Sequence, residues 1–538
     1  MTIGETNFNQ TENQTENHTE NHTEEPAWKK RKCGVLLPIF SLPDRYGIGT
    51  IGRTARRYAE YLASAGVKVW QILPLLPTSY GDSPYQSVCS YALNYYLIDL
   101  ALFAEDGLFT ETELAQYARE NGYGQENSRI NYERLFHTRV PFLKKAFSRF
   151  MSEEYRAKHP CEAENFEAFL KAGEYFDFAL FMSLKTHFSF RPWQEWGEYA
   201  EYREEKAEEF AAGHAEEIRF WQFTQYEFLK QWSELRAHAE QNGVEILGDM
   251  PIYVASDSVE MWKYGKQLFV TDENGMQTEK AGVPPDAFSA DGQLWGNPVY
   301  RWEEMKKDGY AWWKQRIERA FALFDIVRID HFRGFDRYFS IPAAALAARE
   351  GEWKDGPKAE LFKDMKNLPI VAEDLGVIDE GVLQLMKDVG YPGMRVLEFA
   401  FEGSADNTNK PSNSPENSVV YTGTHDNPPF AAYVASLADW EKERFSSDFR
   451  RECEKFGIVS TAQTAEEYAA EAVRLAYASP SFLCVAPLCD LLSLGEEARI
   501  NAPSTLSVKN WSFRFSEEQA FSCAVKERLL RLEEEYQR

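Results

Sequence analysis

The sequence predicts an α/β protein, a (β/α)8 TIM barrel with inserted, mainly helical subdomains and a disordered N-terminal tail. Three short apolar runs each end in an acidic residue, at Asp330, Glu373 and Asp426. Carboxylates that follow successive buried strands are typical of the catalytic face of such a barrel. The chain has 538 residues, enough for one barrel with large insertions.

Composition narrows the class of partner. The chain is 44% apolar and 14% aromatic, as expected of a globular protein with a large core. Its net charge is −26, from 59 basic and 85 acidic residues. This negative balance argues against nucleic acids, anionic membranes and polyphosphates as partners, and it is compatible with a neutral substrate.

The seven cysteines are scattered, odd in number and without a Cys-x-x-Cys pair. This usage is typical of reduced thiols. The sequence has no apolar run of about 18 residues, and its start lacks the charged and apolar regions of a secretory signal. We therefore expect no membrane span and predict a cytoplasmic protein.

The first 27 residues form a low-complexity tail. The pattern Asn-x-Thr-Glu repeats four times from Asn9 to Glu24 and contains no apolar residue. Because such a segment cannot bury enough apolar surface to fold, we expect residues 1–27 to be disordered. Residues 28–538 are expected to form the catalytic barrel.

Eight strands can be followed along the chain. The first two flank a segment of helical spacing at 54–65, and together they make a βαβ unit. A charged helix from Glu517 onward is expected to pack on the outside. The eight expected strands, some with the loop that follows, are 34–40, 67–73, 244–253, 326–330, 370–373, 394–401, 418–426 and 481–490.

Two long segments interrupt the expected alternation of strands and helices. Residues 105–240 are acidic and helical in spacing, which indicates an inserted helical subdomain and not a barrel element. Residues 270–300 are rich in Gly and Pro and indicate a lid loop between the third and fourth strands. Long structureless loops in compact enzymes are usually functional.

The residues around the fourth and fifth strand ends suggest acid–base chemistry. Arg328 lies two residues before Asp330, so both side chains are on one face of the strand. We expect the guanidinium to hold Asp330 ionised and to fix its direction, which suits a nucleophile. Glu373 follows an apolar run, so a raised pKa and a proton-donor role are expected. Retaining glycosidases use such a pair with the carboxyl groups ~5–5.5 Å apart.

Each of these residues also has a structural interpretation. Arg328 and Asp330 could be an ion pair at a strand end, and Asp249 could be a turn residue after the third strand. Trp295 could belong to the core, and His331 could be a structural histidine with satisfied hydrogen bonds. Taken singly, these interpretations are about as good as the functional ones.

Seven motifs, in this order, resemble those of the 4-α-glucanotransferases, also called amylomaltases or disproportionating enzymes, a branch of the α-amylase clan. The resemblance runs from about Gly34 to the C-terminal region. The motifs are Tyr80-Gly-Asp-Ser-Pro-Tyr-Gln-Ser87, Gly248-Asp-Met-Pro-Ile-Tyr-Val254, Gly282-Val-Pro-Pro-Asp286, Gln293-Leu-Trp-Gly-Asn-Pro-Val-Tyr300, Arg328-Ile-Asp-His-Phe-Arg-Gly334, Ala372-Glu-Asp-Leu-Gly376 and Thr422-Gly-Thr-His-Asp-Asn427.

The resemblance implies a role for each matching residue. Asp330 would be the nucleophile, Glu373 the general acid/base and Asp426 the stabiliser of the transition state. Arg328, His331 and His425 would contact the donor sugar, and Tyr80 would lie near a second, more remote glucan contact. The residues expected to line the glucan groove are Ser83, Tyr85, Asp249, Tyr253, Asp286, Phe288, Trp295 and Asn297, with Asn510 also reaching it.

The implied activity is the transfer of α-1,4-glucan segments between maltooligosaccharides through a covalent glycosyl-enzyme, with retention and with neither metal nor cofactor. The aromatic residues Phe288 and Trp295 suggest that the lid excludes water and stacks the acceptor. No carbohydrate-binding module is evident before the barrel, which favours soluble maltooligosaccharides as substrates.

One departure and three rival interpretations follow. The family usually continues the Asp426 motif with Asp or Glu and then Thr, whereas this chain has Pro428-Pro429-Phe430, which puts the loop shape and the acceptor preference or rate in question. An α-amylase-type hydrolase is one alternative, and an inactive glucan-binding relative is another. The third is a Mg²⁺-dependent, enolase-type barrel in which Asp249, Asp330 and Glu373 would ligate the metal.

Overall fold

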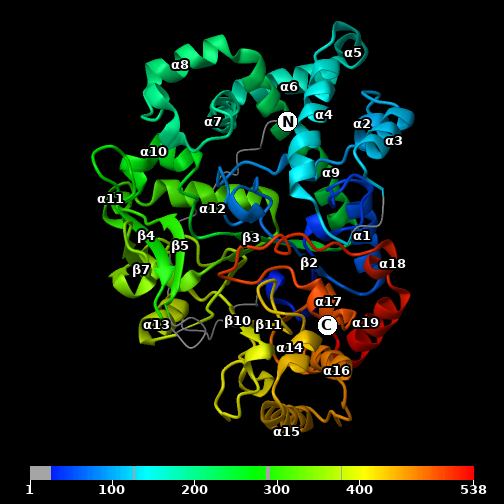
Figure 1. The fold of residues 1–538 in the computed structure, drawn as a ribbon. Coiled ribbons are helices and arrows are strands. Elements are labelled where there is room, and N and C mark those ends of the chain that lie inside the picture. Colours follow the sequence, from blue (N-terminus) through cyan, green and yellow to red (C-terminus); the bar gives the residue numbers. More distant parts are fainter. Residues whose placement is uncertain (1–25, 125–127, 286–290, 377) are drawn as a thin grey trace, which may run out of the picture.

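A computed structural model describes residues 26–124, 128–285, 291–376 and 378–538. Eight parallel strands close into a barrel in the order β1-β12-β11-β10-β9-β6-β3-β2, which confirms the predicted fold (Figure 1). Residues 1–25 of the expected tail lie outside the described part. The barrel strands are β1 (Lys32–Leu36), β2 (Val69–Gln71), β3 (Glu245–Met250), β6 (Ile326–Ile329), β9 (Ile370–Ala372), β10 (Gly393–Val396), β11 (Ser418–Tyr421) and β12 (Leu483–Pro487).

The barrel is filled by alternate side chains of its strands. Leu247, Ile326, Val371, Val419 and other buried aliphatic residues form one cluster inside it. The intervening residues pack outward against helices, so the strands are buried on both faces. This double burial explains why the strands read in the sequence as continuous apolar runs and not as alternating ones.

Helices surround the barrel and extend from it. No helix in the described ranges combines the length and apolar character needed to cross a bilayer. Outside the segment between β2 and β3, the helices are α1 (Arg53–Ser64), α10 (Val259–Leu268), α11 (Trp302–Lys307), α12 (Ala311–Leu323), α13 (Glu380–Val389), α14 (Phe430–Ser436), α15 (Asp439–Lys455), α16 (Ala465–Ala478), α17 (Leu488–Leu491), α18 (Glu517–Ala520) and α19 (Cys523–Tyr536).

The segment between β2 and β3 is helical, but its last helix differs from the expectation. In Figure 1 its middle helices gather at one end of the molecule. Helix α9, expected as part of the insertion, packs on the insertion helix α7 and also on α1 and β3, so it joins the insertion to the barrel just before β3. The eight helices are α2 (Leu102–Glu105), α3 (Glu111–Glu120), α4 (Tyr132–Phe150), α5 (Glu153–Lys158), α6 (Pro160–Ala172), α7 (Phe176–His187), α8 (Glu204–Gly213) and α9 (Ala215–Gln241).

The segment 270–300, expected as a lid loop, is not without regular structure in its described part. This segment contains β4 (Glu279–Val283) and β5 (Gln293–Pro298), which pair with β7 (Arg337–Pro342) and β8 (Glu352–Asp355) in the antiparallel order β5-β4-β7-β8. The partner strand β7 follows β6 in the chain, so its pairing with β4 is non-local and cannot be predicted from a local sequence pattern. The segment is therefore anchored by backbone hydrogen bonds at both of its ends.

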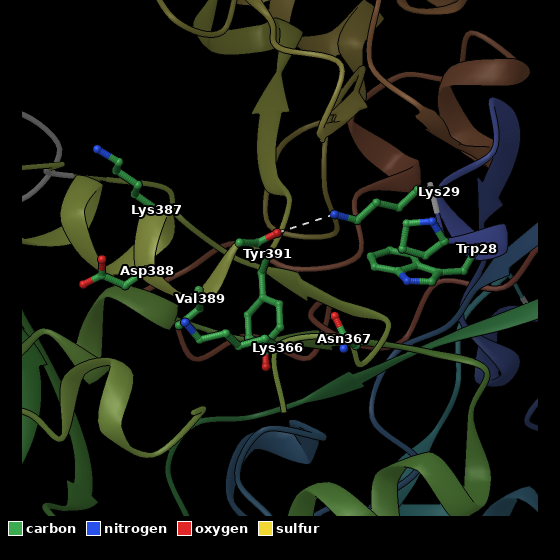
Figure 2. A pocket seen from close by; sticks show the side chains of 10 residues that line it. Trp28, Lys29, Lys366, Asn367, Lys387, Asp388, Val389 and Tyr391 are labelled. Carbon is green, nitrogen blue, oxygen red and sulfur yellow. Dashed lines mark hydrogen bonds between the residues drawn. The ribbon is translucent and has the colours of Figure 1, made fainter. Parts of the chain in front are cut away.

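A pocket of about 300 Å³ opens at the end of the barrel where the strands begin. Figure 2 shows Trp28, Lys29, Lys366 and Tyr391 around it. Lys366 and Tyr391 precede β9 and β10, so the pocket lies at the amino ends of these strands. In (β/α)8 barrels the chemistry is carried by the carboxyl ends, and we therefore do not place the active site here.

A substitution of Gly248 in β3 tests the packing around the strand that carries Asp249. A Cβ atom on Gly248 would lie 2.2 Å from the ring of Phe324. Gly248→Ala should therefore destabilise the protein by about 1–3 kcal/mol, the usual cost of overpacking, and lower its melting temperature. Gly213→Ala is the control, because a Cβ there meets no atom within 4 Å. Equal melting temperatures for the two variants would contradict the described packing.

Candidate active site

Arg328 lies at the centre of the acidic cluster. The register of the barrel places it directly opposite Asp249 on the neighbouring strand β3. Its Nη1 donates to both Asp249 carboxylate oxygens, at 2.8 and 2.7 Å, and its Nη2 lies 3.1 Å from Oδ1 of Asp330. Arg328 and Asp249 are buried, whereas Asp330 keeps 27% of its side chain exposed. One guanidinium thus bridges two carboxylates.

Tyr85, from the loop after β2, joins two distant strand ends. Its hydroxyl donates to Oδ2 of Asp249 at 2.7 Å. Its ring stacks on His425, with the centroids 5.3 Å apart and the planes 13° from parallel. Trp511 contacts both rings, at 5.6 and 5.8 Å between centroids. The structure therefore brings together motifs from the second, third and seventh barrel strands.

The Glu373 carboxylate is held by backbone N–H groups. Its Oε2 accepts from the N–H of His331 at 2.6 Å, and its Oε1 accepts from the N–H of Leu375 at 2.9 Å. His331 adopts a left-handed conformation with φ of +46°, which is rare for a residue other than glycine. This strained turn directly after Asp330 aims the His331 N–H at Glu373. Glu373 is consequently fixed beside Asp330.

Burial raises the pKa of both Asp330 and Glu373. Arg328 opposes the shift at each carboxyl, and the negative charges of Asp249, Glu373 and Asp426 add to it at Asp330. The expectation that Arg328 holds Asp330 ionised is therefore opposed by burial and by these like charges, whereas the ion pair with Arg328 favours the charged form. The expected raised pKa of Glu373 is confirmed.

Asp426 is the most open of the acids, with 45% of its side chain exposed. Its Oδ1 accepts from Nδ2 of Asn501 at 2.6 Å, and its carbonyl accepts from Nη2 of Arg499 at 3.0 Å. Nε2 of His425 lies 3.5 Å from the same Oδ1. Burial lowers the pKa of His425, and it lowers the pKa of His331 to about 3. Both imidazoles are therefore neutral at pH 7 and suited to hydrogen bonds with neutral hydroxyls.

Aromatic side chains flank this cluster on the side of β5. The Trp295 ring meets the His331 ring edge-on, with centroids 4.8 Å apart and planes at 87°. Tyr253 lies 6.2 Å from Trp295 and stacks on Tyr300 at 6.0 Å. Burial raises the pKa of Tyr253, and the negative charge of Asp330 adds to this shift. Trp295 thus lies against the residue that follows Asp330, and Tyr253 lies next to Trp295.

Two other residues expected along the groove, Asn297 and Asn510, make hydrogen bonds within the protein. Asn297 is buried, donating to the Val254 carbonyl at 2.7 Å and accepting from Gln86 at 3.0 Å. Asn510 is also buried, and its amide bonds within the loop 502–510. These contacts support loop structure, and the expected glucan contacts of Asn297 and Asn510 stay proposals from the sequence.

Tyr80 and Ser83 lie between β2 and β3, Tyr80 at the start of the short 3-10 helix Tyr80–Asp82. Tyr80 is 73% exposed, and the Ser83 hydroxyl accepts from the N–H of Tyr85 at 3.2 Å. Asp286 and Phe288 lie outside the described residues. The sequence interpretation missed Arg499 and Asn501, which follow β12 and show no recognisable motif. It also missed Trp511, although the neighbouring Asn510 was singled out.

The prolines after Asn427 fit the start of a helix. Pro429 has a φ of −52° and immediately precedes α14, where a missing backbone donor costs little. The first helical N–H, that of Phe430, donates to Oδ1 of Asp490 at 2.7 Å. The departure from the family pattern is therefore compatible with a regular helix after the Asp426 loop.

The contacts of Arg328 bear on the magnesium-dependent alternative. Its guanidinium already spans Asp249 and Asp330, where that alternative requires a metal ion. Among the described residues, no group of three or more His, Cys, Asp or Glu side chains could hold a metal. The cation that compensates this cluster is therefore the arginine itself.

The fold and the strand-end carboxylates define a (β/α)8-barrel enzyme with a cluster of acids suited to acid–base chemistry. A family model described as 4-alpha-glucanotransferase matches residues 37–519. A 4-alpha-glucanotransferase of Streptococcus pneumoniae is 41% identical over 518 residues, which is 95% of this chain and 98% of the relative. One of Thermus thermophilus is 43% identical over 90% of this chain and 94% of its own.

A solved structure agrees with these sequence matches. The amylomaltase of Streptococcus agalactiae in complex with acarbose matches with a TM-score of 0.86 at 35% identity, over 95% of this chain and 100% of that one. The chain therefore belongs to the 4-alpha-glucanotransferase family, and it is a transferase of that type.

The bridging contact of Arg328 can be tested with two variants. Arg328→Lys keeps the charge, but one ammonium cannot span both carboxylates as a planar guanidinium does. We expect the Lys variant to fold and to lose about 10²-fold in kcat, since small displacements of reacting groups have effects of that size. Arg328→Met leaves Asp249 uncompensated and should lower stability by about 3–5 kcal/mol. A Lys variant with the wild-type kcat would show that the bridge has no catalytic importance.

Proposed function

We propose that this protein is a retaining 4-α-glucanotransferase that moves α-1,4-glucan segments between maltooligosaccharides through a covalent glycosyl-enzyme. The observation that carries the proposal is the pairing of Asp330, bridged to Asp249 by Arg328, with Glu373, which the His331 backbone holds next to it. A nucleophile and an acid/base side by side are what retaining chemistry needs.

In the first step, the ionised Asp330 attacks the anomeric carbon of the donor glucan. The bond from that carbon to the glycosidic oxygen breaks, and Glu373 gives its proton to the leaving 4-hydroxyl. Because the two carboxyls interact, they share protons as a pair. Burial raises the pKa of both carboxyls, but Arg328 is in direct contact with Asp330 and favours the negative charge there, so we assign the proton to Glu373.

In the second step, the 4-hydroxyl of an acceptor glucan passes its proton to Glu373 and attacks the anomeric carbon. The bond to Asp330 breaks, which restores both carboxyls and retains the configuration. Asp426 stabilises the oxocarbenium-like state and binds sugar hydroxyls. The neutral His331 and His425, together with Arg328, contact the donor sugar.

The substrate path follows the aromatic residues around the cluster. We propose that Tyr85, Tyr253 and Trp295 line it, with Asp249 beneath, and that Ser83 lies along its edge. Tyr80 is proposed as a more remote contact, supported by its 73% exposure. Asp286 and Phe288 stay proposals from the sequence.

We also propose the domain division given above, with residues 1–27 as a disordered tail and 28–538 as one catalytic unit. A cytoplasmic location is supported by the seven cysteines, none of which is paired in a disulfide. Soluble maltooligosaccharides are the proposed substrates, without nucleic acid or membrane partners.

Product analysis tests the proposal directly. Incubated with maltotriose alone, the protein should yield glucose and a ladder of shorter and longer glucans, separated by chromatography over time. Asp330→Asn should abolish the ladder, since it removes the nucleophile and typically lowers the rate by orders of magnitude. Glucose and maltose without longer products would identify a hydrolase of the amylase type, and no conversion would support an inactive binding protein.

A Trp295 variant tests whether this side chain helps acceptor sugars to compete with water for the glycosyl-enzyme. Its ring borders His331 and could cover the glycosyl-enzyme while stacking an acceptor sugar. Trp295→Ala should therefore lower the ratio of transfer to hydrolysis by about tenfold, equivalent to 1.4 kcal/mol between the two barriers. The ratio is obtained from released glucose and longer products in the same reaction. An unchanged ratio would remove Trp295 from this role.

A further inference from the structure

A second acid directly follows Glu373, and the proposed mechanism does not use it. Asp374 comes two residues after the end of β9, with 9% of its side chain exposed. The order of the barrel places β9 between β6 and β10. The Glu373 carboxylate accepts from His331, which follows β6, whereas the Asp374 carboxylate accepts from β10. The two consecutive acids therefore bind the neighbours on opposite sides of β9.

Two residues of β10 hold the Asp374 carboxylate. Its Oδ1 accepts from the backbone N–H of Met394 at 2.6 Å, and its Oδ2 accepts from Nη1 of Arg395 at 3.1 Å. The second contact joins opposite charges, and such hydrogen bonds are stronger than those between neutral groups. Asp374 is thus tied both to the backbone and to a side chain of the neighbouring strand.

These contacts supplement a sparse pairing of the two strands. β9 has three residues, and its register with β10 contains one pair, Ala372 opposite Gly393. Three pairs join β9 to β6 on its other side. The hydrogen bonds of Asp374 therefore extend the attachment of β9 to β10 past Ala372, to the point in the chain where the two acids lie.

Gly393 leaves the space that the Asp374 carboxylate occupies. A Cβ atom on Gly393 would lie 2.2 Å from Oδ2 and 2.7 Å from Oδ1 of Asp374. A glycine allows such a close approach to the backbone, whereas a larger residue would displace the carboxylate. This packing is a second observation, independent of the hydrogen bonds, that fixes Asp374 against β10.

The segment that Asp374 anchors also supplies a contact of Glu373. Oε1 of Glu373 accepts from the N–H of Leu375, the residue after Asp374, at 2.9 Å. The backbone N–H of Glu373 donates to the Ile329 carbonyl of β6 at 3.1 Å. The start of the segment is therefore held by β6 and its continuation by β10. A shift of Asp374 would move the Leu375 N–H and with it the Glu373 carboxyl.

We propose that Asp374 is a positioning residue: by accepting the Met394 N–H it anchors the end of β9 to β10 and so fixes the direction of the Glu373 carboxyl. The inference rests on the proposed acid/base role of Glu373. A group that gives and takes a proton must lie within hydrogen-bond reach of the reacting oxygen, so a small displacement lowers the rate. Asp374 itself contacts no reacting atom in this proposal.

Two donors distinguish the positioning of Glu373 from a general structural role. The leaving hydroxyl of maltotriose needs a proton from Glu373, whereas the fluoride of α-maltosyl fluoride leaves without one. Asp374→Ala should lower kcat/KM for glucose release from maltotriose by at least about tenfold, as expected for a displaced catalytic group. It should lower kcat/KM for fluoride release by less than about threefold, since that step needs no acid.

A conservative variant and a control accompany Asp374→Ala. In Asp374→Asn the amide oxygen can still accept from the Met394 N–H, so this variant should retain more activity on maltotriose than Asp374→Ala. Asp388 is an exposed acid on α13 that accepts from Gln384. Asp388→Ala should match the wild type with both donors. The melting temperature of each variant shows whether it is folded under the assay conditions.

Gly393→Ala tests the same carboxylate without removing it. The added methyl group should displace Asp374 and give the same donor-dependent loss, which also provides a test if Asp374→Ala fails to fold. The three atoms nearest to the new Cβ all belong to Asp374. The double variant should therefore lose no more activity than Asp374→Ala alone, and additive losses would contradict a shared mechanism.

Three results would overturn the inference. The first is a wild-type kcat/KM for maltotriose in Asp374→Ala. The second is an equal loss with both donors, which would indicate a general distortion of the site. The third is an Asp374→Asn variant as impaired as Asp374→Ala, which would contradict an anchor that depends on the Met394 N–H.

Glu373→Gln is the reference for the donor dependence. It should lose far more activity with maltotriose than with α-maltosyl fluoride in the fluoride-release assay, because it lacks the acid itself. If Glu373→Gln shows no such difference, or if the wild type is inactive, the proposed function fails. If Glu373→Gln shows the difference and Asp374→Ala does not, the inference alone fails, so the two failures are distinguishable.

Discussion

The site depends on the double ion pair of Arg328. This buried guanidinium compensates Asp249 and reaches Asp330 at the same time. Without it, Asp249 would be an uncompensated buried charge, a defect that typically lowers stability by about 3–5 kcal/mol. The strand register that places Arg328 opposite Asp249 also sets where Asp330 emerges from β6. The most important geometry is therefore fixed by the barrel backbone and not by a loop.

The other strand ends are tied to this centre by neighbours of different origin. Tyr85 links Asp249 to His425, and the strained backbone at His331 holds Glu373. Asp426 is held from outside by Asn501. Sites held within about 0.5 Å by such supporting contacts are those in which catalytic groups keep a productive geometry. The described structure thus provides positioning before a glucan arrives.

Much of this could be predicted from the sequence, because the signals were local. The buried strands are short apolar runs, and the acids of the site follow them directly, as at Asp330 and Glu373. What could not be predicted is non-local: the pairing of β4 with β7, the return of α9 to the barrel, and the contact of Asn501 with Asp426. The raised pKa of Asp330 could not be predicted for the same reason, because burial in the assembled barrel raises it and charges from neighbouring strand ends add to the shift.

The central claim is that Asp330 forms the covalent intermediate while Glu373 handles the proton. Mass spectrometry of Glu373→Gln after reaction with α-maltosyl fluoride tests it most directly. Fluoride leaves without protonation, whereas the missing base slows the second step, so the intermediate should accumulate. The account predicts one maltosyl adduct on the peptide that contains Asp330. Release of fluoride without an adduct, or with an adduct on another residue, would contradict it.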